Sequence, residues 1–478
     1  MRKISFVTLL LASTAFTANA QQMLGVSTSN WCGTKSIDLN PASIADSRTR
    51  FQLDLFGLNF GADNNLGSID FSKAMSSGGN IGNVFTLTKS KEFSIQMPIV
   101  DVHLPSLMVS IDDKNSFAIT SRVRIDNQFN NFNRDLLSSV LAPSNVTGDA
   151  AISSKNFNWT AHVWSEVKLT YAREVYKEGE HYLKAGISLA RLGGIGFLSL
   201  KGANLDGHYY KASDSLQTNH TDIEFATSII DKGSELSNGL GNIASEFFGK
   251  KGGHGLGGDL GVVYEYRPES TNSEDKSSNK YKFRGSMAIN DLGSIKYDAL
   301  EARVTANGYL KASEIDSNSI MTNSQNFNNY FRSHGYTLDT GRRSTKVHMP
   351  TNLNIAFDYY VARHFYVNAM WIKNLAKRQN YGNSVYSQVT ITPRWDTRYF
   401  SVGLPLTYNN LSSSMKAGIG FRLSGLYFGS DDLLAFVGAK AYGVNFYLGG
   451  SIPIQKKRSK SHKGESTTTT TETTTEKG

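Results

Sequence analysis

Hydrophobic and polar positions alternate along much of this 478-residue chain with a period of two. In residues 116–125 one face carries apolar side chains: Phe117, Ile119, Val123 and Ile125. The opposite face is mostly polar: Ala118, Thr120, Arg122 and Arg124. Because successive side chains of a β-strand point to opposite faces of its sheet, this period predicts strands with one apolar and one polar face.

Residues 159–171 repeat the pattern. Their apolar face carries Trp159, Ala161, Val163, Val167 and Leu169. Their polar face carries Thr160, His162, Glu166 and Lys168. In a transmembrane barrel the apolar faces contact lipid and the polar faces line the lumen. We therefore expect these side chains to face a lumen: Arg122, Arg124, His162, Glu166 and Lys168.

Further segments of this kind complete a set of candidate strands. They are residues 50–60, 84–88, 93–99, 107–111, 182–192, 200–211, 257–266, 281–290, 302–311, 352–360, 365–372, 387–393, 399–407, 416–423 and 442–448. We expect some of them to merge, which leaves about 14 to 16 strands, an even number being usual for bacterial barrels. The predicted fold is all-β, a transmembrane antiparallel β-barrel of about 14 strands with short helical insertions.

Three segments depart from the alternation. Residues 223–248 place apolar side chains at helical spacing, which predicts an amphipathic helix or a pair of helices. Residues 134–141 predict a shorter helix. Residues 313–334 are rich in Asn and Ser and predict a long extracellular loop.

The first twenty residues have the three regions of a secretory signal peptide: Arg2 and Lys3, an apolar run over residues 6–16, and Ala18-Asn19-Ala20. A buried first helix or a membrane anchor is the alternative, but the run is short for a membrane span, which needs about 20 apolar residues. We expect the mature chain to begin at Gln21. Its single cysteine, Cys32, excludes an internal disulfide.

Composition favours long aromatic strands, with 43 Gly, 22 Tyr and 26 Phe against 9 Pro. After residue 20 no stretch is apolar enough for a membrane helix, so an exported chain of this kind is soluble or crosses a membrane as a closed barrel. The mean hydropathy of −0.33 fits a barrel, whose strands devote every second residue to the lumen. The net charge of +9 is spread along the chain, which argues against nucleic acid as a partner.

The chain ends in a basic and then Thr-rich segment with no apolar side chains to bury, and we expect this tail to be disordered. It is either a tether in the periplasm or an unselected, solvated extension. The predicted division is a signal peptide at 1–20, a hatch or plug at 21–49, an outer-membrane barrel at 50–454, and a periplasmic tail at 455–478.

Enzyme and cofactor motifs are weak. The run from Gly253 to Gly258 fits G-x-G-x-x-G, but a strand follows it where a dinucleotide site needs a helix, so we interpret the glycines as turn or bend positions. The ten histidines include no H-E-x-x-H pair, and there is no G-x-S-x-G elbow. We expect no catalytic residue, metal or cofactor. His162 is the first histidine to check for a triad formed across strands.

Short motifs resemble the FadL family of long-chain fatty-acid transport barrels, and most nearly an uncharacterised branch of FadL-like outer-membrane proteins of Bacteroidetes. They are Asn40-Pro41-Ala42 before the first strand, the glycine-rich residues 255–265, and residues 290–295. The resemblance implies a fourteen-stranded barrel, an N-terminal hatch and hydrophobic cargo. It assigns Asn40, Pro41 and Ala42 to the hatch. It assigns structural roles to Gly255, Gly257, Asp259, Gly261, Asp291 and Gly293, with the two aspartates satisfying backbone groups at strand ends.

Two functions follow. The first is passive uptake or binding of a hydrophobic small molecule, although the charged inner face is unexpected for such cargo. The second is a structural or client-shuttling barrel of a protein secretion apparatus such as type IX secretion. Both need outer-membrane lipid around the barrel and the outer-membrane assembly machinery to insert it.

Overall fold

A computed structural model describes residues 22–69, 85–88, 90–136, 148–229, 252–268, 280–311, 314, 323–377, 380–434 and 440–456. The expected signal peptide, the tail beyond Lys456 and most of the expected helical segment at 223–248 lie outside these residues.

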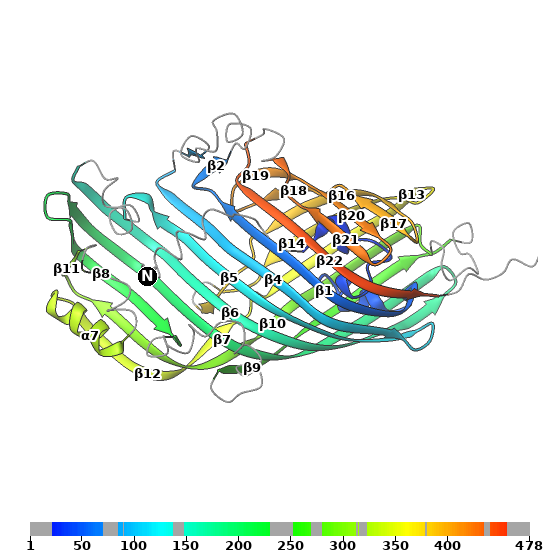
Figure 1. The fold of residues 1–478 in the computed structure, drawn as a ribbon, viewed down its shortest axis with the longest axis horizontal. Helices are drawn as coiled ribbons and strands as arrows, with labels where there is room; N and C mark the ends of the chain where they lie inside the picture. The colour runs from blue at the N-terminus through cyan, green and yellow to red at the C-terminus, as the bar shows by residue number, and fades with distance from the viewer. Residues whose placement is uncertain are drawn as a thin grey trace, which may run out of the picture.

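The strands form one closed antiparallel barrel of 14 strands, as the sequence predicted, with β22 paired to β1 (Figure 1). The first half of the barrel consists of β1 (Thr49–Asn64), β4 (Glu92–Ser110), β5 (Asn115–Asn133), β6 (Ala150–Glu178), β7 (His181–Tyr210), β8 (Ser215–Thr227), β9 (Gly253–Tyr266) and β10 (Phe283–Thr305). The second half consists of β12 (Thr337–His348), β13 (Asn352–Ala362), β14 (Phe365–Asn374), β16 (Gln388–Asp396), β17 (Phe400–Gly403), β18 (Leu406–Asn409), β19 (Ser414–Ala417), β20 (Ile419–Leu423), β21 (Leu426–Ser430) and β22. The last strand covers Gly443–Gln455.

Some barrel strands are built from two pieces placed end to end. β8 and β9 both pair with β7 and with β10, so together they fill one position in the wall. β12 and β13 likewise share one position beside β10, and β17 and β18 share one beside β16. β19 and β20 share the next position, where β19 pairs with β18 and β20 pairs with β17. The short strands β11 (Tyr309–Lys311) and β15 (Tyr381–Gly382) extend the sheet locally, and β2 (Gly67–Ile69) pairs with β3 (Phe85–Leu87) outside it.

Several expected strands merge. The segments at 93–99 and 107–111 are both parts of β4, and those at 182–192 and 200–211 are both parts of β7. β8, β12 and β21 were not predicted. The expected strand at 84–88 exists as β3 but lies outside the barrel.

The helical predictions are partly wrong. Residues 223–227 belong to strand β8, because a short apolar run can fit either period and here pairs with β7 and β10. The expected loop at 313–334 contains helix α7 (Ser324–Ser333), which Asn323 caps by accepting from two backbone N–H groups. Residues 134–136 are helical, and the rest of that expected helix lies outside the described residues. Among the described residues, no helix is long and apolar enough to cross a membrane.

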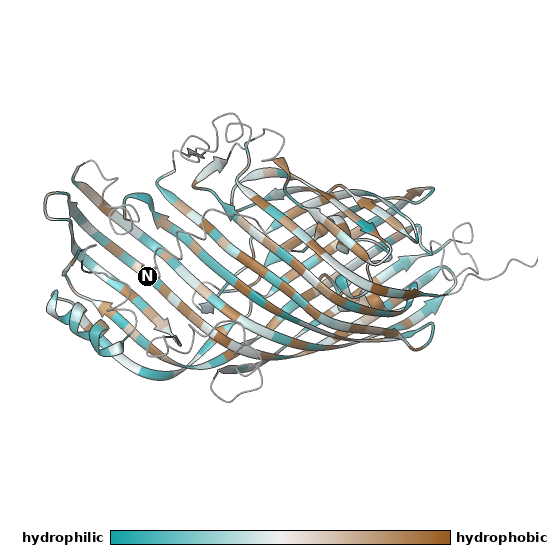
Figure 2. Cartoon of the chain, in the orientation of Figure 1, coloured by the Kyte–Doolittle hydropathy of each residue, from teal (hydrophilic) through white to brown (hydrophobic). Residues whose placement is uncertain are grey.

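Brown and teal residues alternate along the strands in Figure 2, and large apolar side chains are exposed around the outside of the barrel. Examples from strands around the ring are Ile119, Leu169, Leu189, Met287, Phe357, Ile391, Phe428 and Ile452. Helix α7 covers part of the wall, where Phe327 stacks on Phe225 with ring centroids 5.1 Å apart.

The N-terminal segment, residues 22–48, lies inside the ring of strands (Figure 1). It contains α2 (Leu24–Ser27) and the 3-10 helices η2 (Gly33–Ser36) and η3 (Pro41–Ile44). Ile37 and Ile44 are fully buried and pack against inward-facing Met108, Ala118 and Ala172 of the wall. The barrel therefore contains a packed core of its own residues.

Candidate functional site in the barrel lumen

The residues Asn40, Pro41 and Ala42 rest directly on wall glycines. Gly186 of β7 and Gly261 of β9 are register partners. A Cβ atom on Gly261 would lie 2.1 Å from Asn40 Oδ1, and one on Gly186 would lie 2.4 Å from the Ala42 nitrogen. The wall is therefore built from glycine at the point where the N-terminal segment touches it.

Asn40 fixes this contact with its side chain. Its Oδ1 accepts from the Ala42 N–H and caps helix η3. Its Nδ2 donates to the carbonyl oxygens of Val262 (3.0 Å) and Met287 (3.2 Å). Pro41 occupies the first position of the helix, where the N–H that proline lacks has no helical partner to lose.

Wall asparagines hold the preceding residues. Asn290 Nδ2 donates to the carbonyl oxygens of Asp38 (3.1 Å) and Leu39 (3.0 Å), and Asn354 Nδ2 donates to that of Leu39 (3.1 Å). The motif at 290–295 thus contacts, in the lumen, the two residues that directly precede the motif at 40–42.

The remaining motif residues lie in the pairing of β9 with β10. Gly255 and Gly257 face the β10 backbone, where Cβ atoms would lie 2.0 Å from the Ser294 oxygen and 2.6 Å from the Leu292 oxygen. Gly293 has a φ of +124°, and the register shifts between Ile289 and Leu292. The glycines at 253–258 are part of a strand, and a nucleotide site with a following helix is not formed.

Asp259 and Asp291 meet at this register shift rather than at strand ends. Asp259 Oδ1 accepts from the Asp291 N–H (2.9 Å), and its Oδ2 lies 2.7 Å from Lys168 Nζ. Asp291 in turn contacts Arg124 Nη1 at 3.0 Å. Both aspartates therefore join the charged groups of the lumen.

Arg122 is the centre of that charged network. It forms ion pairs with Glu166, with Asp38 of the N-terminal segment (3.2 Å) and with Asp101 (3.2 Å). It also reaches Asp291 at 3.4 Å. Burial opposes ionisation of Asp38, but the Arg122 guanidinium outweighs it and holds the pKa of that carboxyl well below its usual range. The segment is thus held to β5 by charge as well as by packing.

His162 faces the interior but makes no triad. Its Nε2 hydrogen-bonds to Tyr297 Oη (2.9 Å), and its ring stacks on Trp164 with centroids 4.6 Å apart. Its Nδ1 is buried with no hydrogen-bond partner among the described residues. Among all the residues that the structure describes, no group of three histidine, cysteine, aspartate or glutamate residues is placed to hold a metal.

One part of the inner wall is apolar. We define the apolar cluster by its buried members: Trp164, Ala190, Leu192, Phe197, Ala226, Ile295, Tyr297, Ala299, Val347 and Met349. It lies level with an interruption of the strand pairing among the described residues, since β8 ends at Thr227 and β9 begins at Gly253. Phe197 of β7 and Tyr297 of β10 fall between the residues that pair with these two strand ends.

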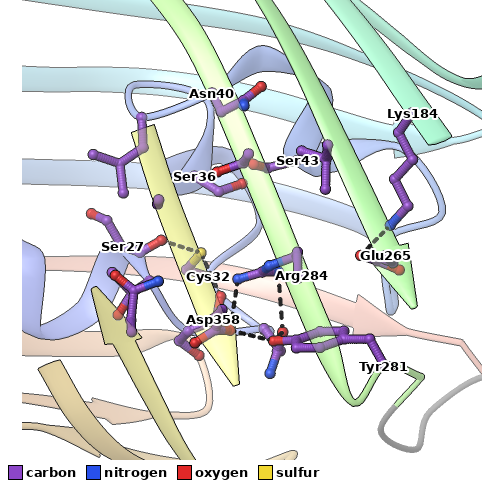
Figure 3. A pocket seen from close by; sticks show the side chains of 18 of the residues that line it. Ser27, Cys32, Ser36, Asn40, Ser43, Lys184, Glu265, Tyr281, Arg284 and Asp358 are labelled. Atoms are coloured by element: carbon purple, nitrogen blue, oxygen red, sulfur yellow. Dashed lines mark hydrogen bonds and ion pairs between the residues drawn. The ribbon is translucent and has the colours of Figure 1, made fainter. Parts of the chain in front are cut away.

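A polar cavity, partly open to solvent, separates the N-terminal segment from β7, β9, β10 and β13 (Figure 3). Arg284 and Tyr281 both reach the Asp358 carboxylate, at 3.1 and 2.5 Å, and Lys184 pairs with Glu265 at 2.7 Å. Outside the strands, burial lowers the pKa of Lys280 to about 8 despite its pairing with Asp46. The cavity suits water and polar groups better than hydrocarbon.

The connection between β14 and β16 crosses the lumen on the other side of the charged network. Asn383 donates to the backbone oxygens of Asp126 and Thr160, both at 3.2 Å. Ser384 exchanges hydrogen bonds with Gln128, at 3.0 Å in each direction. The described interior is thus filled from one end by the N-terminal segment and crossed by this connection further along.

Sequence reasoning did not identify Asp38, Asp101, Gly186 or the connection around Asn383 as parts of the site. Asp101 lies in β4 between two expected strands, so predicting one continuous strand there would have included it in the barrel wall. Gly186 carries no signal in the sequence, because its role depends on a contact with residues far away in the chain.

The fold and lumen define a closed fourteen-strand β-barrel whose interior holds its own N-terminal segment. Residues 41–431 match the model of a family of unknown function, DUF5723, and the chain belongs to that family. No curated protein matches it by sequence.

Solved structures of barrels resemble the chain at low identity. The P. putida toluene transporter TodX is 12% identical over 92% of this chain and 99% of that chain, with a TM-score of 0.42. A Pseudomonas aeruginosa FadL homologue is 8% identical over 91% and 97%, with a TM-score of 0.38. The outer membrane protease OmpT from Escherichia coli is 8% identical over 84% and 96%, with a TM-score of 0.23.

Proposed function

We propose that the protein is an outer-membrane barrel that passively takes up a hydrophobic small molecule. The exposed apolar side chains around the ring support the membrane location, since water would not favour them and lipid would. The pairing of β1 with β22 closes the ring, and a closed ring is the form in which strands cross a bilayer. In this proposal residues 21–49 are the hatch, and residues 50–454 are the barrel.

The apolar cluster behind the wall interruption carries the proposal. Around Arg122 the inner wall is charged, and inward apolar side chains such as Met108 and Met370 pack against the N-terminal segment. The apolar cluster includes no residue of that segment, and its aromatic and aliphatic side chains gather where the described strand pairing is interrupted. Apolar cargo requires apolar surface, and the interruption of the described strand pairing offers a sideways route that avoids the charged network around Arg122. The alternative role in protein secretion has no specific observation in its favour and stays a prediction.

The ends of the barrel support an orientation. Thr49 at the start of β1 pairs with Gln455 at the end of β22, so both ends of the barrel sequence reach the same rim. In an outer-membrane barrel of even strand number this rim is periplasmic, which places the tail at 455–478 in the periplasm.

Uptake of a labelled fatty acid into proteoliposomes tests the function. Ala299→Trp fills the apolar cluster and should reduce the initial uptake rate at least several-fold, because a large side chain closes the route. The matched control is Ala369→Trp, since Ala369 is exposed on the outer face of β14. Saturable uptake that Ala299→Trp leaves unchanged would contradict the route, and folded wild-type protein without saturable uptake would contradict the function.

A further inference from the structure

A row of cationic side chains crosses the outer face of the wall on neighbouring strands. His254 of β9 is the register partner of Lys296 of β10, and Lys296 is the register partner of Lys346 of β12. Arg191 of β7 lies two positions from Gly193, the β7 partner of His254, and so on the same face of the strand. All four side chains are exposed, while Ile295 and Tyr297 on either side of Lys296 are buried. The four residues therefore point outward, and we call them the cationic row.

The cationic row lies just beyond the apolar part of the outer surface. On β10 the outward apolar side chains run from Phe283 to Leu292, a length of about 20 to 25 Å along the barrel axis for a tilted strand. That length matches the apolar band of about 25 Å in outer-membrane barrels. Lys296 comes four residues later, at the end of the band away from Thr49. The row thus lies at the level of lipid headgroups.

The charges of the row are not neutralised within the described residues. Lys296 and Lys346 face each other directly, and like charges at opposite positions of two strands destabilise their pairing. Neither lysine forms an ion pair with a described residue, and the neighbouring carboxylate of Asp298 pairs with Arg342 at 3.4 Å. An external anion at this position would remove the repulsion.

We infer that the cationic row binds the phosphate group of an anionic lipid in the outer leaflet. The apolar surface beside the row favours a lipid over free phosphate, because Leu256 and Leu189 are 77% and 65% exposed there and can contact acyl chains. Lysine binds phosphate as a compact point charge, so two lysines can share one headgroup. The inference rests on the proposed membrane location and is independent of the cargo.

Native mass spectrometry of protein released from phosphatidylcholine nanodiscs containing phosphatidylglycerol tests the inference. The wild type should retain phosphatidylglycerol in preference to phosphatidylcholine. Lys296→Ala with Lys346→Ala should reduce that preference about 25-fold, since each lysine beside anionic lipid contributes roughly a factor of five. Arginine at both positions should preserve the preference for phosphatidylglycerol. Lys114→Ala with Lys177→Ala removes two exposed lysines at the other rim and serves as the control.

The outcomes separate the inference from its premise. Wild-type protein that inserts into nanodiscs but retains both lipids equally, or a double alanine variant that keeps the preference, overturns the inference and leaves the membrane location standing. Displacement of the lipid by millimolar inorganic phosphate would show a free-anion site and overturn the lipid assignment. Failure of the folded wild type to insert would instead overturn the membrane location.

Discussion

Gly186 and Gly261 lie directly opposite each other in the pairing of β7 with β9, and neither has room for a Cβ atom on its lumen side. The atoms in the way belong to Asn40, Pro41 and Ala42. Two glycines that pair in the wall thus form the surface on which the N-terminal segment is seated. A substitution at either glycine should therefore displace the N-terminal segment before it disturbs the strands of the barrel.

Alanine at Gly261 should therefore loosen the N-terminal segment. The new methyl group would overlap Asn40 Oδ1, and displacing the segment exposes Cys32, the single cysteine of the chain. Burial raises the pKa of the Cys32 thiol to about 11, so maleimide should label the wild type slowly near neutral pH. We expect labelling of Gly261→Ala to be at least about tenfold faster, which corresponds to about 1.4 kcal/mol.

Gly341→Ala is the control, because no atom lies within 4 Å of the position its Cβ would take. Equal labelling rates in both variants would contradict the seating role. A barrel that still resists unfolding in detergent would show that the change is local to the segment.

Asn40→Ala should have a similar effect through lost hydrogen bonds. The substitution removes the cap of η3 and leaves the carbonyl oxygens of Val262 and Met287 without this donor. Loss of a cap costs about 1 kcal/mol, and each buried hydrogen bond contributes a similar amount. Cys32 labelling should therefore accelerate at least about fivefold, while the exposed Asn410→Ala should leave it unchanged.

The barrel itself could be predicted because its physical cause is local. The alternation around Ile119 and Leu169 depends only on neighbouring residues and on which face meets lipid, and it survives in the structure as exposed side chains. Strand ends were less predictable. β7 runs through a bulge at Gly194–Gly196, where the period shifts, so one strand was divided into two predicted segments.

The site was less predictable because it depends on contacts across the lumen. Asn40 and Gly261 stood in separate motifs, and nothing in the sequence shows that they touch. Arg122 was expected in the lumen, but its four acidic partners come from different strands and from the N-terminal segment. Such groups of contacting residues are determined by how the barrel closes and by the path of the N-terminal segment inside it.

Asp38 and Arg122 should show strong energetic coupling. Arg122→Gln leaves several buried carboxylates without their cation and should lower the free energy of unfolding by about 3 to 5 kcal/mol. Asp38→Asn removes one partner and should cost less, with a coupling energy of about 1 to 3 kcal/mol between the two sites. Urea unfolding of the wild type, both single variants and the double variant measures this coupling energy.

The pair Arg303 and Asp222 provides the comparison, because it has similar geometry at 3.0 Å but Arg303 is mostly exposed. Its coupling should lie below about 1 kcal/mol. A coupling for Asp38 and Arg122 as small as that of the exposed pair would show that the N-terminal segment is not held by this contact.

Asp431 and Asp432, between β21 and β22, should make stability depend on pH. Burial raises the pKa of Asp431 from 3.8 to about 6 and that of Asp432 to about 7. Because a raised pKa means that the folded state favours the protonated carboxyl, the stability it contributes is complete below about pH 4 and is lost as pH rises through about 6 to 7. The free energy of unfolding, measured with urea, should therefore fall by about 5 kcal/mol in all between about pH 4.5 and 8. Asp432→Asn should remove much of this fall.

The exposed Asp112→Asn is the control and should leave the pH dependence unchanged. Asp431 lies beside the N-terminal segment, where it accepts from the Leu24 N–H at 2.8 Å. A wild-type stability that stays constant or rises over this pH range would contradict the assignment of buried, protonated carboxyls there.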